Sequence, residues 1–417
     1  MIDYPNKLDK IFDKLLISSI KPIIVGGYVR DSLLKIKSKD IDIELYGISS
    51  FKKLEKILEE FGDVNSVGKS FGVCKLKFDD LDLDFSFPRI DSKIDKGHKG
   101  FEIKIDSSLD FKTATSRRDF TMNAIGYDIE SKKILDPYNG REDLNNRILK
   151  AVDIKKFTDD PLRVLRAIQF SARFNLSIDN ELFITCKNMI ENSLLDELPK
   201  ERIFLEIQKL FLKSPAPSLG ILLLKKLGSL KLFIELLSLQ NTDFDQTLMA
   251  IDKMSTLKTT DETTNTVLML ALLSYKLSIS SREKFLSQLT NSKSLIAKIL
   301  ILLKHQNFIN FDEFIDYDIY VLATQVNIEE FILFHKAISN SKKKLQSLDK
   351  LQKRAKELGI LNKKAEAILQ GKDIIKLGLK PSKEFSKILD RAYRAQISGE
   401  FTTKKDGNIW LKKELLT

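Results

Sequence analysis

Cysteine, histidine, proline and glycine are all scarce in this chain of 417 residues. Its two cysteines, Cys74 and Cys186, exclude a disulfide-based scaffold and any cysteine-based zinc site, and they fit a reducing cytoplasm. Three histidines are too few for a histidine-rich metal centre, so we expect carboxylates to hold any metal. Glycine and proline number 17 and 9, about half of their usual joint share of about 12%, which predicts few turns and mostly helix.

Long hydrophobic runs are also missing. The longest apolar stretches, such as 296–303, are far shorter than a membrane-spanning helix. The N-terminal residues are charged and lack the apolar core of a signal peptide. We therefore expect a cytoplasmic protein with no membrane association, and the sequence leaves its oligomeric state open.

Positive charge is in excess, and the excess is confined to the C-terminus. The chain has 69 basic and 58 acidic residues, a net charge of +11. Residues 341–417 contain 20 basic against 9 acidic residues, whereas residues 1–340 contain 49 of each. A basic tail on a neutral body is typical of a protein that binds a polyanion, most simply a nucleic acid. A lysine-rich solvated surface is the alternative interpretation.

The periodic patterns predict a small mixed α/β unit followed by helices, an α+β fold. Early helices are expected at 6–20 and 28–36, and from residue 146 onward nearly the whole chain has helical spacing, with breaks at 214–218 and 340–344. The expected strands are 21–27, 41–47, 72–78, 81–87 and 123–129, with 72–78 and 81–87 forming a hairpin at Asp79 and Asp80.

The segment IIVGGYVRD, residues 23–31, predicts a strand that runs into two glycines and then a helix. Gly26 and Gly27 would let the backbone turn sharply and approach a ligand closely. Free N–H groups at the start of the helix suit a phosphate, and Arg30 would add positive charge one turn later. An ordinary strand-to-helix turn is the alternative interpretation.

The segment KDIDIE, residues 39–44, places carboxylates at alternate positions of a strand. Asp40 and Asp42 then point to the same face, and Glu44 shares that face. Neighbouring carboxylates repel each other unless a cation lies between them, and Mg²⁺ prefers oxygen ligands. The pair therefore predicts a Mg²⁺ site close to the glycine turn; a solvated acidic strand is the alternative interpretation.

GGYVRDSLL followed by KDIDIE resembles the nucleotidyltransferase superfamily that includes DNA polymerase β. Within it, the sequence is similar to class II tRNA nucleotidyltransferases and bacterial poly(A) polymerases. This resemblance implies a polymerase β-like catalytic head followed by an all-helical neck, body and tail. It also implies that Asp40 and Asp42 are catalytic and hold the metal. A third carboxylate often lies on a neighbouring strand, where Asp84 is the best candidate and Asp82 the second.

Four further segments extend the resemblance over nearly the whole chain. They are SRRDFTMNAIGYD (116–128), LDPYNGREDL (135–144), DDPLRVLRA (159–167) and GKDIIKLGLKPSKEFSKIL (371–389) with AQISGEFTTKKD after it. In the family, the first of these contacts the triphosphate and sugar of the nucleotide. That role carries over to Arg118, Asp119 and Asn123.

The motif order implies four parts in the chain. These are a catalytic head at 1–145, a neck with the nucleotide-selecting motif at 146–205, a helical body at 206–340 and a basic RNA-binding tail at 341–417.

Asp160 and Arg163 are spaced to share one face of a helix, with Pro161 in its first turn. A carboxylate accepts hydrogen bonds and a guanidinium only donates them. Cytosine and adenine present an amine donor beside a ring-nitrogen acceptor, whereas uracil and guanine present the reverse order. The pair would thus fit CTP and ATP, and Arg166 would support the phosphates or orient Asp160. A solvated intrahelical ion pair is the alternative interpretation. Many relatives have arginine in place of Gln169, so any role of that arginine is absent here.

The helical body lacks a feature of some relatives, an appended phosphohydrolase domain with a His-Asp pair after an apolar helix. Ser274 and Tyr275 stand where that pair would be expected, so we predict no hydrolase activity. His305 and His335 are then ordinary surface or core histidines.

The sequence thus predicts an Mg²⁺-dependent CCA-adding tRNA nucleotidyltransferase, with tRNA as partner and CTP and ATP as substrates. A poly(A) polymerase, a partial enzyme that adds only CC or only A, and a non-catalytic RNA-binding protein remain alternatives. Partial CC-adding relatives tend to lack a flexible loop before RRDFT. The polar segment 88–102 resembles that loop and favours full CCA addition, and the intact carboxylate pair argues against a non-catalytic protein.

Overall fold

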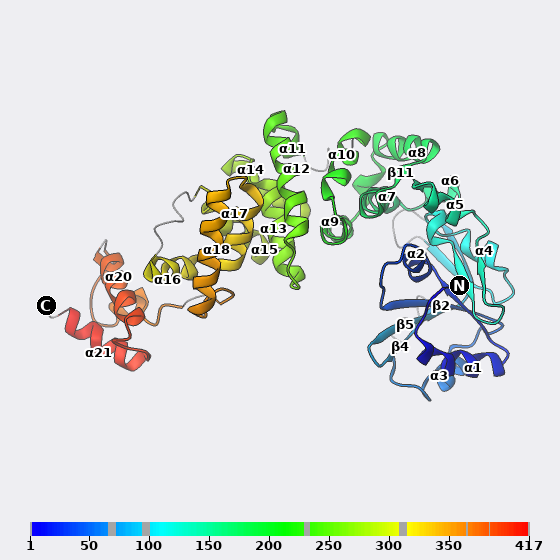
Figure 1. The fold of residues 1–417 in the computed structure, drawn as a ribbon, viewed down its shortest axis with the longest axis horizontal. Helices are drawn as coiled ribbons and strands as arrows, with labels where there is room; N and C mark the ends of the chain where they lie inside the picture. The colour runs from blue at the N-terminus through cyan, green and yellow to red at the C-terminus, as the bar shows by residue number, and fades with distance from the viewer. Residues whose placement is uncertain are drawn as a thin grey trace. The chain divides into compact units, whose positions relative to one another are not determined.

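The computed structural model describes residues 2–65, 72–93, 101–228, 234–307, 315–363, 366–382 and 384–415. The chain divides into two compact units, Met1–Leu232 and Phe233–Thr417 (Figure 1). The candidate site lies in the first unit, and each unit is described by itself.

The first unit begins with a seven-stranded mixed sheet in the order β3-β4-β5-β2-β1-β8-β9. Only β2 and β5 pair in parallel, and the neighbouring described pairs are antiparallel. The strands are β1 (Lys21–Val25), β2 (Asp40–Tyr46), β3 (Val64–Asn65), β4 (Val73–Phe78), β5 (Leu81–Ser86), β8 (Gly126–Asp128) and β9 (Lys133–Leu135).

Alternation within the central strands separates a core face from a site face. Ile41 and Ile43 of β2 and Leu83 and Phe85 of β5 are buried, while the aspartates between them face the other side. Helices α1 (Asp9–Ile17) and α3 (Phe51–Leu58) pack on each other, on β1 and on β4, and α2 (Gly27–Leu33) packs on β1 and β2. The buried core therefore fixes the direction in which the aspartates point.

The predicted loop at 88–102 is in part a two-stranded antiparallel arm. Strands β6 (Arg89–Lys93) and β7 (Phe101–Ile105) pair from Arg89 with Ile105 to Lys93 with Phe101. Residues 94–100 lie outside the described residues. The prediction of a loop over the whole segment is therefore wrong for its two ends, because backbone pairing between them outweighs their polar composition.

Helices dominate the rest of the first unit. They are α4 (Phe111–Thr115), α5 (Gly140–Asn145), α6 (Ile154–Phe157), α7 (Leu162–Phe174), α8 (Asn180–Glu191), α9 (Lys200–Lys213) and α10 (Pro217–Leu227). Short 3-10 turns occur at Asn6–Leu8, Thr121–Asn123 and Leu194–Glu197, and β10 (Ile148–Leu149) pairs with β11 (Ser177–Ile178). Helix α7 packs against both α9 and α10.

The described part of the second unit is helical. Its helices are α11 (Ile234–Leu237), α12 (Asn241–Thr256), α13 (Glu262–Ser274), α14 (Ile279–Leu289), α15 (Lys293–Lys304), α16 (Asp316–Gln325), α17 (Ile328–Ile338), α18 (Lys342–Glu357), α19 (Gly371–Ile375), α20 (Glu384–Ile397) and α21 (Lys404–Glu414). Helix α13 is apolar on all sides and is buried among α12, α15 and α17.

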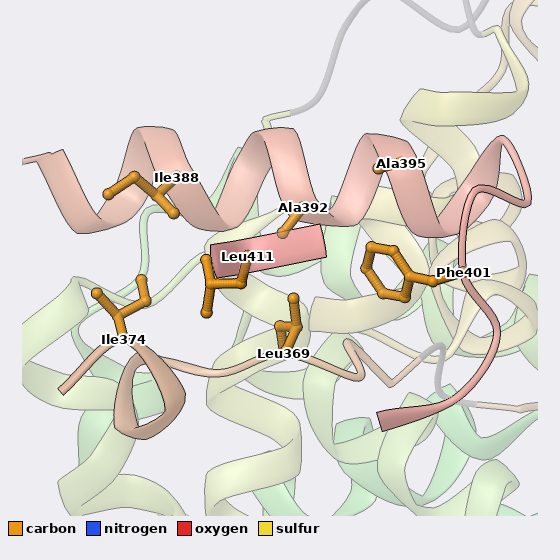
Figure 2. Packing of buried hydrophobic residues seen from close by; sticks show 7 residues of the cluster. All are labelled: Leu369, Ile374, Ile388, Ala392, Ala395, Phe401 and Leu411. Atoms are coloured by element: carbon orange, nitrogen blue, oxygen red, sulfur yellow. The ribbon is translucent and has the colours of Figure 1, made fainter. Parts of the chain in front are cut away.

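The last helices, α19 to α21, have a small apolar core of their own, shown in Figure 2. Its seven buried residues are Leu369, Ile374, Ile388, Ala392, Ala395, Phe401 and Leu411. Helix α18, by contrast, packs on α17 and buries Leu348 and Leu351.

The predicted α+β class is confirmed: a mixed-sheet head precedes a mostly helical remainder. The hairpin at Asp79 is present, and Asp79 has a φ of 54°. The expected breaks at 214–218 and 340–344 overlap the gaps between α9 and α10 and between α17 and α18, and each runs two or three residues into the helix that follows. Among the described residues, no helix is both long and apolar enough to cross a membrane.

Candidate active site

A cleft of about 1060 Å³ opens on the site face of the sheet. It is bounded by the glycine turn, by strands β2, β4 and β5, and by residues of α7 and α9. Its charged lining residues are Arg30, Asp31, Lys37, Lys39, Asp40, Asp42, Asp63, Lys75, Lys77, Asp82, Asp84, Arg166, Arg173, Lys209 and Lys213.

Four aspartates form a square on β2 and β5. The parallel register sets Asp40 beside Asp82 and Asp42 beside Asp84. Although the Asp42 side chain is accessible to solvent, the protein atoms around it partly desolvate its carboxylate and raise its pKa. The charges of Asp84 and Asp40 raise the pKa further, against the opposing effects of Arg118 and Lys75. The two carboxylates that the sequence singled out therefore repel each other and Asp84, which is the property expected of a cation site.

Lysines from β4 face this square. In the antiparallel β4–β5 pair, Lys75 lies opposite Asp84 and Lys77 opposite Asp82. The Nζ of Lys75 donates to both carboxylate oxygens of Asp84, at 3.0 and 2.7 Å, and these bonds raise the pKa of Lys75. Asp84, the expected third ligand, is thus paired with a lysine.

Glu44 shares the strand face of Asp40 and Asp42, as the alternation predicts, but it is fully buried. It accepts a 2.7 Å hydrogen bond from the Tyr46 hydroxyl and a 3.1 Å bond from Arg117. These contacts give Glu44 a role in holding Arg117 against the sheet, and Glu44 does not line the cleft.

Gly26 is required at the turn for two reasons. Its φ of 69° lies in the left-handed region that side chains disfavour, and a Cβ there would come within 2.6 Å of an Arg118 guanidinium nitrogen. The glycine thus makes room for Arg118, whose pKa burial lowers. Gly27 lines the cleft, whereas Gly26 and Arg118 are not among its lining residues.

Arg30 is buried and bonded to its neighbours. It donates to Asp31 at 2.8 and 2.6 Å and to the Asn123 side-chain oxygen at 2.6 Å, and its guanidinium lies over the Phe170 and Phe174 rings. Burial lowers its pKa against the attraction of Asp31. Its donors are therefore directed largely at the protein, and its contact with phosphate stays a prediction.

The remaining residues of the RRDFT segment join this network. Asn123 donates to Asp119 at 2.9 Å, and Arg166 donates to the other Asp119 oxygen at 2.7 Å. Burial raises the pKa of Asp119, but Arg166 and Asn123 outweigh it and hold that pKa below the usual range. Arg166 thus orients Asp119, and within the described part of the chain no hydrogen bond or ion pair joins Arg166 to Asp160.

Asp160 and Arg163 lie near each other in sequence but bind different partners. Helix α7 begins at Leu162, with Pro161 as its N-cap. Asp160 therefore lies just before the helix, and Pro161 stands one position earlier than the predicted place in the first turn. Asp160 accepts from the Leu162 amide at 3.1 Å and from Arg202 at 3.1 Å. Arg163 donates to the carbonyls of Lys156 and Arg117, both at 2.8 Å. Neither residue lines the cleft.

Cations of α7 and α9 that the motifs do not mark also belong to this region. Arg173 pairs with Asp31 at 3.4 Å, and Lys209 pairs with the buried Glu206 at 2.8 Å. Lys213 lies one turn after Lys209 and lines the cleft as well. The sequence could have indicated the position of Arg173, because Arg166 and Arg173 are seven residues apart and therefore share a helix face.

Gln169 and Ser274, the two departures from the family pattern, are buried. The side-chain nitrogen of Gln169 makes no hydrogen bond within the described residues. Ser274 donates to the Leu270 carbonyl at 2.8 Å, inside α13. His335 is buried and its Nε2 lies 3.1 Å from the His305 carbonyl oxygen, as expected of a core histidine.

The donors at the square suit a divalent cation. Asp40 and Asp42 are exposed on one face of β2, and carboxylate oxygens are the ligands that divalent cations such as Mg²⁺ prefer. Within the described ranges, no three carboxylate, histidine or cysteine side chains converge in a metal-binding arrangement. The residues present therefore fit a cation held by two carboxylates, with Asp84 engaged by Lys75.

Three family models match the chain. The Poly A polymerase head domain matches residues 23–150, the probable RNA- and SrmB-binding site of polymerase A matches 175–239, and the putative tRNA nucleotidyltransferase domain 2 matches 261–407. Together they cover the head, the helices that follow it and most of the second unit.

Curated relatives match over a shorter stretch. The Multifunctional CCA protein of Pseudoalteromonas atlantica is 35% identical over 213 residues, 50% of each chain. The CCA-adding enzyme of Buchnera aphidicola subsp. Schizaphis graminum is 35% identical over 195 residues, 46% of this chain and 45% of that one. The match spans about half the length of these relatives.

Solved structures share the fold over nearly the whole chain. The CCA-adding enzyme of Bacillus stearothermophilus, crystallised with CTP, superposes with a TM-score of 0.72 at 22% identity and covers 99% of this chain and 98% of that one. The chain thus has the fold of that CCA-adding enzyme. Its head, the helices that follow and most of the second unit each match a family model of poly(A) polymerases or tRNA nucleotidyltransferases, so the chain is similar to these enzymes along most of its length.

Proposed function

We propose that this protein is an Mg²⁺-dependent CCA-adding tRNA nucleotidyltransferase. It transfers CMP from CTP and AMP from ATP to the 3′ end of tRNA without a nucleic-acid template. The tRNA 3′-oxygen forms a bond to the α-phosphorus, the bond from that phosphorus to the β-phosphate bridge breaks, and pyrophosphate leaves. The observation that carries the proposal is the exposed Asp40–Asp42 pair at the floor of a cleft with basic walls.

The carboxylate pair is the proposed centre of the chemistry. Asp40 and Asp42 would hold Mg²⁺, which when bound supplies a Lewis acid that favours deprotonation of the attacking hydroxyl and neutralises charge on the phosphates. The cations on the cleft walls, among them Arg173, Lys209 and Lys213, would bind the triphosphate and the tRNA backbone. Positioning and charge stabilisation account for the catalysis in this proposal.

Nucleotide choice is assigned to Asp160 and Arg163. Each Asp160 oxygen already accepts one bond, from Leu162 or from Arg202, and retains a lone pair for the amine of cytosine or adenine. Arg163 uses two of its five N–H donors on backbone carbonyls and retains others for a ring nitrogen. The two carbonyl partners of Arg163 fix the plane of its guanidinium. Uracil and guanine would then place a carbonyl oxygen against the Asp160 carboxylate and an N–H against the Arg163 guanidinium, so neither hydrogen bond would form.

The proposal predicts further properties that follow from the same residues. The basic residues of 341–417 would bind tRNA, and Arg118, Asp119 and Asn123 would shape the nucleotide pocket through the Arg30 and Arg166 contacts. The body at 206–340 would lack hydrolase activity, since Ser274 is packed inside a helix. The four-part division of the chain and a cytoplasmic location belong to the same proposal.

The deciding experiment supplies a tRNA that lacks its 3′ CCA with Mg²⁺ and each nucleotide alone or in combination, followed by sequencing of the products. Addition of C, C and A, in that order and with termination, is the expected result. A long A tail would identify a poly(A) polymerase, the activity for which the head model is named. Addition of only CC or only A would identify a partial enzyme, and no addition would favour a non-catalytic RNA-binding protein.

A further inference from the structure

The Lys75–Asp84 pair is a charged contact that the proposed reaction does not use. Lys75 Nζ reaches both oxygens of Asp84, at 3.0 and 2.7 Å, from the opposite position on the adjacent strand. Asp84 in turn lies beside Asp42 in the parallel register. Lys75 thus neutralises Asp84, the carboxylate that lies directly beside the proposed metal ligand Asp42.

Lys75 is free to exchange this partner. Its side chain is 58% exposed, whereas that of Asp84 is 32% exposed. Breaking such an exposed pair costs little, typically less than 1 kcal/mol, because water solvates both charges. The backbone pairing of β4 and β5 fixes where Lys75 starts, and the long flexible stem allows Nζ to leave without disturbing the sheet.

We propose that Lys75 is a built-in counter-ion that competes with the divalent cation for Asp84. With Lys75 in place, the cation has two carboxylates, Asp40 and Asp42, and when Lys75 withdraws, Asp84 becomes a third. An anionic triphosphate entering the cleft offers Lys75 another partner, so nucleotide binding would release Asp84 to the cation. Lys75 thereby couples binding of the nucleotide to binding of the divalent cation. This inference rests on the proposed metal-binding role of Asp40 and Asp42.

Lys77 supplies a matched control. It lies two residues along the same strand face, lines the same cleft and faces Asp82, the partner of Asp40. No hydrogen bond or ion pair of Lys77 to a carboxylate is found among the described residues. Replacing either lysine by methionine removes the same charge and keeps a similar stem, but only Lys75→Met frees Asp84.

The test measures Mn²⁺ binding to the full chain without nucleotide, by electron paramagnetic resonance of the free ion, with Mg²⁺ as competitor. Lys75→Met should tighten Mn²⁺ binding by up to about 30-fold, the attraction in water between a divalent cation and the single charge of the freed Asp84 carboxylate about 4 Å away. Lys77→Met should change it less than about twofold, because Lys77 makes no ion pair with a carboxylate among the described residues and its removal frees none. Circular dichroism melts would establish that both variants are folded.

A second pair of variants separates competition from simple charge removal. Asp84→Asn should change Mn²⁺ affinity little in the wild type, since Lys75 already engages that carboxylate. In the Lys75→Met background it should abolish the gain, because the freed carboxylate that supplies it is then missing. A gain that persists in Lys75→Met with Asp84→Asn, or an unchanged affinity in Lys75→Met, would overturn the inference.

Asp42→Asn distinguishes this failure from failure of the proposed function. If Asp42→Asn loses Mn²⁺ and Lys75→Met gains nothing, only the role of Lys75 is wrong. If Asp42→Asn binds Mn²⁺ as the wild type does, the proposed metal site itself is wrong.

Discussion

At the residue scale, exposure separates the carboxylates that can act on a ligand from those that support them. Asp40 and Asp42 are exposed, whereas Glu44, Asp119 and Asp31 are buried and engaged by hydrogen bonds or arginines. The sequence placed Glu44 on the same face correctly. Strand alternation does not reveal that Arg117 and Tyr46 cover it, because these contacts depend on packing from outside the strand.

The proposed metal pair gives a direct mutational prediction. Asp42→Asn should lower the rate of both C and A addition by at least about 10³-fold, because one cation ligand and its charge are lost. The melting temperature should not fall, since the side chain is exposed and its replacement relieves repulsion from Asp40 and Asp84. Rates at saturating Mg²⁺ and thermal melts check both points.

The control for this variant is Asp80→Asn. Asp80 also carries an exposed carboxylate, but it is paired with Lys7 at the hairpin turn, away from the cleft lining. It should keep wild-type rates. Near-normal turnover in Asp42→Asn would contradict the assignment.

His335 predicts a pH-dependent stability of the second unit. Burial between Phe331 and Phe334, with a smaller effect of Lys344, lowers its pKa to about 3. The unfolded chain takes up the proton near pH 6.5, so the stability that the neutral ring supplies is complete above that pH and is lost as pH falls towards 3. As the pH falls from 6 to 4, the free energy of unfolding of His335→Gln should therefore decrease by about 1.4 kcal/mol less per pH unit than that of the wild type.

Urea unfolding of the two proteins over this pH range measures the difference in slope. The glutamine keeps a donor for the His305 carbonyl, so the comparison isolates the titration from the hydrogen bond. Parallel stability curves would show that His335 does not titrate between the folded and unfolded states.

At the scale of elements, the contact between α7 and α9 orients the proposed base-reading group. Arg202 of α9 donates to Asp160 at 3.1 Å, and one of its terminal nitrogens is buried without a hydrogen bond in the described part of the chain. The sequence motif contains Asp160 and Arg163 but not their true partners, which come from another helix and from backbone carbonyls. Helical spacing finds neighbours within a helix, not across two.

Arg202→Met should weaken nucleotide selection without abolishing addition. Asp160 would lose one of its two orienting bonds, a cost of about 1 kcal/mol, so the preference for CTP over UTP and for ATP over GTP should fall about fivefold. Asp160→Ala removes the acceptor itself and should lower the preference further, by about 10- to 100-fold. The measurement is kcat/KM for all four nucleotides on a tRNA that ends before CCA.

Leu205→Ala, an exposed change on the same helix, is the matched control and should leave these ratios unchanged. If Arg202→Met and Asp160→Ala slow all four nucleotides equally, the contact is a structural ion pair with no part in selection.

At the scale of the whole molecule, the basic segment 341–417 is not one packing unit. Helix α18 carries many lysines of this segment, yet the apolar face of α18 packs on α17. Helices α19 to α21 instead share the separate core of Figure 2. Deleting residues 341–417 would therefore remove the positive charge and also expose the apolar face of α17 that α18 covers. Substitution of exposed lysines is the cleaner test of RNA binding.

Replacing Lys342, Lys350, Lys353 and Lys356 of α18 by glutamine should weaken tRNA binding and flatten its salt dependence. Each lost phosphate contact should lower the slope of log K against log salt by about 0.7–0.9. Lys10, Lys52, Lys53 and Lys56 are exposed on α1 and α3, and the same substitutions there give the same change of net charge. An equal slope in the two variants would show that α18 makes no specific phosphate contact.

The sequence by itself determined the α+β class, the order of the elements and the pairing of Asp40 with Asp42. These features depend on local periodicity: a period of two sets both aspartates on one strand face, and repeated three- and four-residue spacing marks the helices. Motif resemblance then indicated the similarity to poly(A) polymerases and tRNA nucleotidyltransferases, which the comparisons confirm.

Only the tertiary structure decided which distant groups meet that pair. The parallel pairing of β2 with β5 sets Asp84 beside Asp42, and the β4–β5 hairpin sets Lys75 opposite Asp84. Packing of α7 pairs Arg166 with Asp119, and α9 supplies Arg202 to Asp160. Strand register and helix docking are set by burial of apolar faces over the whole unit, so local spacing does not contain them.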